Sequence, residues 1–153
     1  QNVKDFKEIK NRKAKFEYHF LQSYEAGITL VGTEVKSIKS GLANLTDAYC
    51  IYKNGELFIK SLYIAEYPFG NVHNHETRRD RKLLLKKTEL KKIERRVKEK
   101  GNSVIPYRIY LSERRMIKVE IHVAQGKKSY DKRESIRSKD QKRDLDRIKK
   151  ISL

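Results

Sequence analysis

The stretch IPYRIYLSERRMIKVEIHV, from Ile105 to Val123, decides how this chain folds. On both sides of SERR, apolar residues recur at every second position, with mostly polar or charged residues between them. Successive side chains of a strand point to opposite faces, so each half predicts a strand with one apolar face. The two strands can form an antiparallel pair with that face against a core. Pro106 has no N–H for a strand ladder and indicates an edge or entry position.

Three further stretches have the composition of strands. AKFEYHFL, residues 14–21, alternates aromatic and polar side chains, which is typical of a half-buried strand. GITLV, residues 27–31, predicts another strand after a break at residues 26–27. AYCIYKNGELFI, residues 48–59, predicts a β-hairpin, because the Asn-Gly pair at 54–55 tolerates the positive φ angles of a type I′ turn.

Two stretches predict helices between these strands. GTEVKSIKSG, residues 32–41, reads as a short helix that Thr33 can cap and Gly41 can end. KTELKKIERRVKEKG, residues 87–101, has apolar side chains three or four positions apart, cations over the rest of its surface and a closing Gly101. Each helix therefore has a narrow apolar stripe for a core.

Five or six antiparallel strands with two or three inserted helices predict a mainly β fold. At this size they fit a small OB-like antiparallel β-barrel, because closure removes exposed strand edges. We expect the barrel to occupy residues 1–124. Residues 125–153 form a basic C-terminal tail that has too few large apolar side chains to fold alone, so we expect it to be disordered by itself.

The net charge of +17 over 153 residues is extreme and implies anionic partners. Nucleic acid is the leading candidate, followed by an anionic membrane surface and acidic proteins. The single cysteine, Cys50, excludes an intramolecular disulfide and favours a reducing compartment. The sequence has no apolar run of roughly 20 residues and no signal-peptide pattern. We therefore expect a soluble cytoplasmic protein without a membrane role.

Two basic surfaces lie within the predicted barrel. The first, ETRRDRKLLLKK at residues 76–87, contains Arg78, Arg79, Arg81, Lys82, Lys86 and Lys87. Arginine offers a planar fork of donors to phosphate oxygens, and lysine a point charge. The second is the face of the 87–101 helix with Lys91, Lys92, Arg95, Arg96 and Lys98. The alternative for both is a solvated charged face, with acids of the helix forming weak surface ion pairs.

The tail is the third basic surface. From Lys127 to Lys150 it contains eleven Lys or Arg and five Asp or Glu, a net charge of +6. On a helix, side chains three or four positions apart from Lys132 to Lys150 align into one basic stripe. This pattern predicts a segment that becomes helical when it binds RNA. The alternative is an untargeted, solvating tail.

The tripeptide HNH at residues 73–75 does not predict a nuclease. Nucleases of that name use separated residues on a ββα metal unit, and only four histidines are present. No second cysteine or paired carboxylates join them at metal-ligand spacing, and no phosphate loop, nucleophile elbow or zinc-protease motif occurs. We therefore predict no catalysis, no metal and no cofactor. A metal nuclease would instead cleave RNA with Mg²⁺ and lose that activity in His73→Ala.

Three motifs carry a resemblance to a known family. They are GTEVKS at 32–37, RKLLLKKTEL at 81–90 and AQGKKSYDKR at 124–133. With them, the chain resembles the small protein B (SmpB) family, whose members bind transfer-messenger RNA (SsrA RNA) in bacteria. The resemblance runs in the same motif order from about Asn11 to Lys150.

The resemblance implies an OB-like barrel that binds the tRNA-like domain of transfer-messenger RNA. In trans-translation, the family accompanies this alanyl-charged RNA to ribosomes stalled on messages without a stop codon. The tail enters the decoding centre and the empty mRNA channel and becomes helical there. The implied partners are transfer-messenger RNA and small-subunit ribosomal RNA, with no membrane or small-molecule substrate, and we expect a monomer. The alternative is a generic ribosomal or tRNA-binding OB-fold protein.

The resemblance also implies site residues. Those matching the RNA-binding positions of the family barrel are Asn11, Arg12, Lys13, Glu34, Lys36, Arg79, Arg81, Lys82 and Leu84. Those expected in the decoding centre or mRNA channel are Lys127, Lys128, Tyr130, Asp131, Lys132, Arg133, Arg137, Lys139, Arg143, Arg147 and Ile148. The tyrosine occupies the position whose ring stacks at the decoding centre. Departures from the family pattern occur at Thr77, Asp80, Lys86 and Gln141.

Overall fold

The computed structural model describes residues 6–70 and 73–128, followed by residues 130, 132–134, 136–137 and 142–143. The strands are β1 (Ile9–Lys10), β2 (Tyr18–Ile28), β3 (Ala43–Asn44), β4 (Tyr49–Lys53), β5 (Glu56–Lys60), β6 (Tyr63–Ile64), β7 (Arg81–Leu84), β8 (Asn102–Leu111) and β9 (Ile117–Gly126). The helices are α1 (Arg12–Glu17), α2 (Gly32–Lys39) and α3 (Lys87–Val97). All strand pairs are antiparallel.

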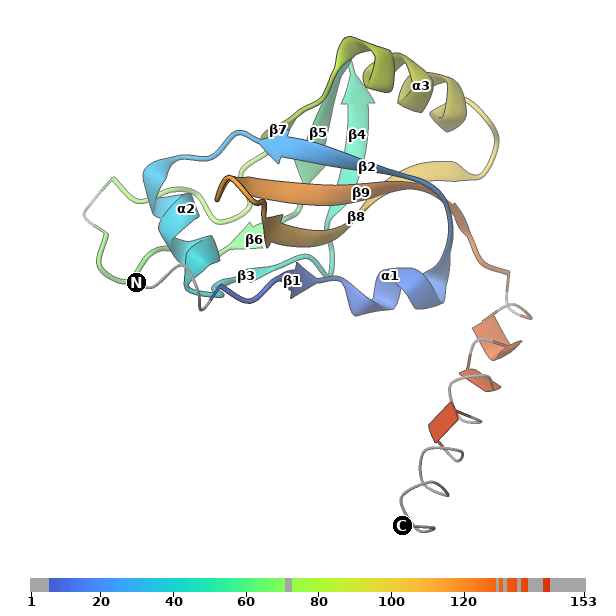
Figure 1. Cartoon of the computed structure of the whole chain (residues 1–153), viewed down its shortest axis with the longest axis horizontal. Coiled ribbons are helices and arrows are strands. Elements are labelled where there is room, and N and C mark those ends of the chain that lie inside the picture. Colours follow the sequence, from blue (N-terminus) through green and yellow to red (C-terminus); the bar gives the residue numbers. More distant parts are fainter. Residues whose placement is uncertain are drawn as a thin grey trace.

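The main sheet closes into a barrel. Its strands follow the order β8-β4-β5-β7-β2-β9, and β9 pairs again with β8 (Figure 1). β1 pairs with the far end of β8, and β3 and β6 form a separate small sheet. The prediction of a mainly β, OB-like barrel with two or three inserted helices is confirmed. β9 runs to Gly126, so its last two residues lie in the range predicted as tail.

The stretch that decides the fold forms the β8–β9 hairpin, as predicted. One detail differs. The register shifts between Pro106 and Arg108, so Tyr107 is an extra residue that reverses the alternation of β8. Val104 and Ile109 point into the main core, whereas Ile105 and Tyr107 pack into a second cluster with Ala14 of α1. The prediction that Ile105, Tyr107 and Ile109 share one face was therefore wrong, and Pro106 lies at this bulge in mid-strand rather than at an edge.

The first predicted strand was also partly wrong. Residues 12–17 form α1, and the strand begins only at Tyr18. The helix forms because Ala14 can bury its side chain (1% exposed) in the second cluster, whereas Phe16 stays 38% exposed. The predicted break at residues 26–27 is absent, since β2 continues to Ile28. A Cβ on Gly27 would lie 3.2 Å from Leu84 Cβ, so the glycine lets β2 and β7 approach closely.

The hairpin at 54–55 and the other two helices form where predicted. Asn54 and Gly55 have φ angles of 51° and 78°, and β4 and β5 pair on either side. Gly41 has a φ of 77°, its N–H donates to Ile38 O, and the next N–H donates to Ser37 O, which ends α2 in a Schellman motif. The predicted cap was wrong: Val31, not Thr33, is the N-cap residue of α2.

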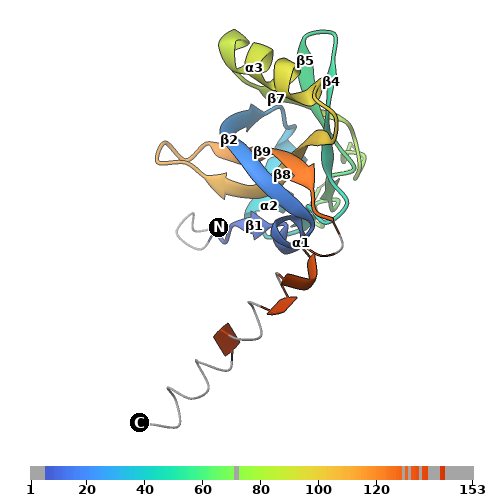
Figure 2. The same cartoon turned by 90° about the vertical axis from the view of Figure 1, so that its right-hand side faces the viewer.

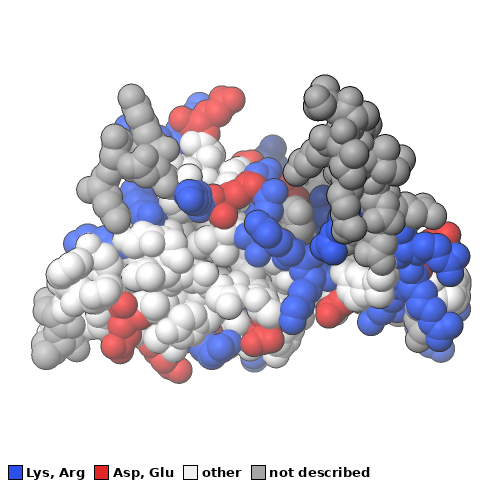
Figure 3. Space-filling model, turned by 90° about the horizontal axis from the view of Figure 1, so that it is seen from below, with Lys and Arg blue, Asp and Glu red and all other residues white. Residues whose placement is uncertain are grey.

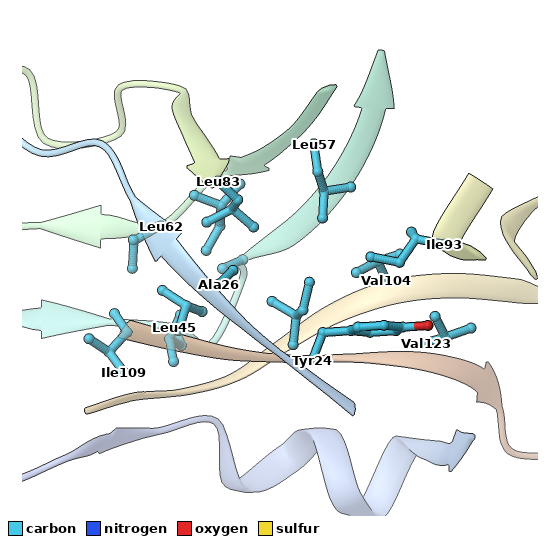
Figure 4. Close-up of a cluster of buried hydrophobic side chains, with 14 of the residues drawn as sticks. Tyr24, Ala26, Leu45, Leu57, Leu62, Leu83, Ile93, Val104, Ile109 and Val123 are labelled. Atoms are coloured by element: carbon cyan, nitrogen blue, oxygen red, sulfur yellow. The ribbon is translucent and has the colours of Figure 1, made fainter. Parts of the chain in front are cut away.

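The core fills the barrel and is covered at one end by α3. Figure 4 shows Leu57, Leu83 and Ile93 among the clustered side chains, and all three are fully buried. Ile93 comes from α3, so the apolar stripe of that helix faces the barrel while its charged residues face outward. Burying such a side chain contributes roughly 1.5–3 kcal/mol. α3 thus lies at the opposite end of the molecule from the α1 and β1 side (Figures 1 and 2).

Candidate RNA interface

Glu34 lies at the centre of a buried ion cluster between α2 and β7. Its side chain is fully buried, and Arg79 Nη2 and Arg81 Nε donate to its two oxygens at 2.6 and 2.5 Å. The Val31 N–H donates to Oε1 at 2.9 Å, so the same carboxylate caps α2. Burial raises the pKa of Glu34, but hydrogen bonds from Arg79, Val31 and Arg81 outweigh it and hold the pKa below its usual 4.5. The charged carboxylate therefore orients two arginines at neutral pH.

Arg81 is also fully buried and ties several segments together. Its Nη1 donates to Leu62 O at 2.7 Å, and its Nη2 donates to the carbonyl oxygens of Thr77 and Glu76 at 3.3 and 3.4 Å. Its guanidinium thus has a carboxylate and three backbone carbonyls as partners. This arrangement satisfies a buried charge, which would otherwise be costly.

The predicted basic surface at 76–87 is therefore divided between interior and exterior. Along β7, Arg81 and Leu83 point inward, while Lys82 and Leu84 point outward. Lys82 Nζ lies 3.5 Å from Glu56 Oε1, and Leu84 is 53% exposed. Arg79, whose side chain is 35% exposed, reaches solvent from the edge of the Glu34 cluster. Of the predicted residues, the structure brings together Glu34, Arg79 and Arg81.

Lys36 lies on the exposed side of α2, one turn of helix along from Thr33. Its Nζ is 5.7 Å from the centre of the Tyr67 ring, within the range of a cation–π contact. Tyr67 in turn packs edge-to-face against Phe69. Neither aromatic residue was predicted as a site residue. The sequence feature that could have indicated them is an aromatic pair on either side of Pro68 in a strongly basic chain.

The remaining predicted residues of the barrel lie at the start of α1. Asn11 is buried, its Nδ2 donates to Leu45 O at 3.3 Å, and its backbone N–H donates to Tyr107 O at 2.7 Å. Arg12 and Lys13 are exposed in the first turn of α1. Asn11 thus fixes the helix start on the barrel, and the two cations after it face solvent.

The C-terminal segment begins beside α1. Gly126 pairs with Tyr18, and the Lys127 N–H donates to Glu17 O at 2.8 Å. The first tail residues are therefore attached to the end of the helix that presents Arg12 and Lys13. Seen from below, Lys and Arg side chains gather on the half of the molecule that holds α1 and the start of the tail (Figure 3).

Beyond Lys128, the described residues of the tail have helical backbone. Tyr130 is 64% exposed, and the Lys132 N–H donates to Lys128 O at 3.1 Å, which is a helical bond. Predicted site residues with this conformation are Tyr130, Lys132, Arg133, Arg137 and Arg143. The predicted residues that lie outside the described part of the chain are Asp131, Lys139, Arg147 and Ile148.

The outer face of α3 presents cations, of which Lys98 pairs with Glu94 at 3.3 Å while three others have no such partner among the described residues. Glu89 accepts the N–H of residue 86, and Glu94 accepts the hydroxyl of Tyr52. Lys91, Lys92 and Arg95 are exposed and form no ion pair with any residue that the structure describes. This face therefore carries positive charge that the acids of the helix do not neutralise.

The histidine motif has a local structural use. His75 Nδ1 lies 2.8 Å from Thr33 Oγ1, and His75 Nε2 lies 2.9 Å from Ile64 O. Both ring nitrogens are thus occupied by partners within the chain. In the described part of the chain, no three His, Cys, Asp or Glu residues gather as a metal site, and no helix is long and apolar enough to cross a membrane.

Comparisons with known proteins agree over nearly the whole length. The family described as SmpB protein matches residues 8–151. An SsrA-binding protein of Parabacteroides distasonis is 51% identical over 140 residues, covering 92% of each chain. One of Cytophaga hutchinsonii is 52% identical over 141 residues, again covering 92% of each. A solved structure described as "tmRNA-SmpB: a journey to the center of the bacterial ribosome" is similar with a TM-score of 0.69 and 42% identity, covering 85% of this chain and 94% of the other.

Proposed function

The chain belongs to the SmpB family, and from this membership we propose that it is an RNA-binding adaptor of trans-translation. It binds the tRNA-like domain of transfer-messenger RNA, delivers that RNA to stalled ribosomes and places its C-terminal tail in the decoding centre and empty mRNA channel. The observation that carries the proposal is the family match over residues 8–151, which includes both the barrel and the tail.

We divide the predicted barrel residues by their burial. The phosphate contacts are the cations that reach solvent, namely the exposed Arg12, Lys13 and Lys36 and the half-buried Arg79 and Lys82. Asn11, Glu34 and Arg81 are buried. We therefore propose that they position these cations and do not contact the RNA directly. This network fixes the positions of the arginine and lysine side chains. Cations in fixed positions match only one arrangement of phosphates, so they favour one RNA shape, whereas unpositioned charge binds any RNA. Leu84 supplies an exposed apolar contact beside Lys82.

The tail supplies the second site. Its exposed cations meet ribosomal RNA, and the exposed Tyr130 ring offers a face for stacking on a base. Helical backbone at its described residues supports a tail that can be helical when it is bound. We propose a barrel unit, which extends two residues beyond the predicted boundary at 124 to include the end of β9 at Gly126, and a ribosome-binding unit in the tail that follows it. Both units act in the cytoplasm, where their ribosomal partner works, and neither contributes a catalytic step.

The alternative is a generic ribosomal or tRNA-binding OB-fold protein. The two proposals differ in preference among RNAs at one salt concentration. We expect the full chain to bind the tRNA-like domain at least roughly tenfold more tightly than an RNA duplex of equal length, in 150 mM salt, because non-specific phosphate binding is weak there. Equal affinity for the tRNA-like domain, an ordinary tRNA and the duplex would favour the generic protein.

A further inference from the structure

Phe69 is the most exposed of the large apolar side chains that the structure describes, at 86%. Its ring packs edge-to-face on Tyr67, with 5.7 Å between the centroids and an interplanar angle of 70°. An aromatic ring left in water lacks the burial that stabilises most rings of its size. Its position therefore calls for a partner.

The loop that presents this ring is built to hold its shape. The Asn74 side chain clamps the Tyr67 backbone from both sides: its Oδ1 accepts the Tyr67 N–H at 3.2 Å, and its Nδ2 donates to Tyr67 O at 2.9 Å. The Gly70 N–H also donates to Tyr67 O, at 2.9 Å. A Cβ on Gly70 would lie 2.5 Å from Asn74 Nδ2, so a side chain at this position would displace the amide that holds Tyr67.

His75 anchors the clamped loop to the candidate interface. Its ring joins Thr33 of α2 to Ile64 of β6, and the side chain is only 7% exposed. The adjacent histidine and asparagine of the HNH motif thus act as loop supports. Asn74 fixes the backbone of Tyr67, on which the exposed Phe69 ring packs.

Cations lie over two tyrosine rings in this part of the chain, one in the aromatic loop and one in β6. Lys36 Nζ lies 5.7 Å from the Tyr67 ring centre, and the guanidinium carbon of Arg78 lies 5.4 Å from the Tyr63 ring centre. A flat aromatic face next to cations is the combination that binds unpaired nucleotides, since the ring stacks on the base while the cation meets the phosphate. We propose that Phe69, supported by Tyr67, is a stacking platform for an unpaired base of the bound RNA.

This platform rests on the proposed RNA-binding function and adds a contact that the charged residues do not provide. A protein partner fits the loop less well, because stable protein interfaces bury about 800 Å² on each side around an apolar centre. Here a single exposed ring packs on Tyr67, whose own ring lies 5.7 Å from the charged group of Lys36. The platform also accounts for the clamp on Tyr67, since a ring held by fixed neighbours loses little conformational entropy when a base stacks on it.

The test compares three substitutions at one exposed position in the full chain. Phe69→Ala removes the ring, Phe69→Leu keeps an apolar side chain without a π face, and Phe69→Trp restores a larger ring. For the tRNA-like domain of transfer-messenger RNA, we expect Phe69→Ala and Phe69→Leu to weaken binding roughly 5- to 150-fold, with Phe69→Trp close to the unchanged protein. The slope of affinity against salt concentration should stay the same, because no phosphate contact is lost.

Asn74→Ala tests the support separately. It leaves Phe69 in place but removes the clamp on Tyr67, so we expect weaker binding of the same RNA, by a smaller factor than Phe69→Ala. A blunt-ended, fully paired RNA duplex serves as the reference probe, and its affinity should change little in any variant.

Two results would overturn the platform. One is unchanged affinity in Phe69→Ala while the unchanged protein still prefers the tRNA-like domain. The other is an equal loss in Phe69→Trp and Phe69→Ala, because a ring would then not be what the RNA recognises. If the unchanged protein shows no preference for the tRNA-like domain, the proposed function fails instead, which this design reports separately.

Discussion

The loop and strand at 76–87 and the tail after Lys127 are both strongly basic in sequence, yet only the first has a cation buried in the core. In the first, Arg81 is fully buried and Glu34 neutralises it, with Arg79 at the rim. In the second, Arg133, Arg137, Lys142 and Arg143 are exposed on helical backbone. A cation buried in the core needs ion-pair and hydrogen-bond partners within the chain, whereas an exposed cation remains available to a binding partner.

The largest expected effect separates these two uses of charge. Arg81→Met leaves the Glu34 carboxylate buried beside one remaining arginine. We expect the free energy of unfolding to fall by about 3–5 kcal/mol, the usual cost of breaking a buried ion pair. Urea denaturation of the full chain measures it. Arg79→Met, whose side chain is 35% exposed, should cost clearly less.

The double variant Glu34→Gln/Arg81→Met provides the matched control. It leaves no unpaired buried carboxylate, so it should be more stable than Arg81→Met alone. A double variant as unstable as the sum of its single variants would show that Glu34 and Arg81 are not coupled.

Acid should remove the contribution of Glu34 to stability. The pKa of Glu34 lies below 4.5 in the folded chain, so its contribution to stability is complete above about pH 4.5 and is lost as the pH falls through the folded value. The stability difference between the unchanged protein and Glu34→Gln should therefore narrow in acid. Denaturation midpoints at pH 7 and at about pH 3 test this, and a constant difference would argue against a charged Glu34.

A smaller effect is expected from the tail ring, and in a different readout. Tyr130 is 64% exposed, so Tyr130→Ala should change the unfolding free energy by less than about 0.5 kcal/mol. Peptide tagging on stalled ribosomes should fall roughly 5- to 150-fold, since stacking at the decoding centre is lost. Tyr130→Phe keeps the ring and should retain most of the tagging. Equal tagging in Tyr130→Ala and the unchanged protein would exclude the stacking role.

The smallest effect concerns the exposed cations of α3. In Lys91→Ala/Lys92→Ala/Arg95→Ala, stability should stay within about 0.5 kcal/mol, because these side chains have no ion-pair partner among the described residues. If they meet phosphates, the salt slope of non-specific RNA binding should fall by roughly 2 to 3, as expected for three lost contacts. An unchanged slope would identify the face as solvated charge only.

The barrel could be predicted from the sequence because its main signals are local. Alternation in β8 and β9, the Asn54-Gly55 turn and the apolar stripe of α3 each depend on neighbouring residues. The bulge at Tyr107 could not, because it depends on which face α1 covers. For the same reason, the aromatic alternation in residues 14–17 suggested a strand where a helix forms.

The residue types of the candidate site could be predicted, but their burial could not. RxRK in sequence does not reveal that the second arginine points inward, because strand alternation only has meaning once β7 is placed beside β2 and β5. The clamp by Asn74 and the anchoring by His75 depend on contacts between residues that are distant in the chain, such as Thr33 and His75. Such contacts leave no periodic signal.

The central claim is that the barrel and the tail are separable sites, and truncation tests it most directly. The chain should end at Lys128, because this keeps β9 complete and preserves the hydrogen bond from Lys127 to Glu17. Affinity for transfer-messenger RNA and peptide tagging on ribosomes stalled without a stop codon are then measured beside the full chain. We predict nearly equal affinity with tagging abolished. Loss of affinity for transfer-messenger RNA together with loss of tagging would contradict two separate sites and would mean that the tail contributes to binding that RNA.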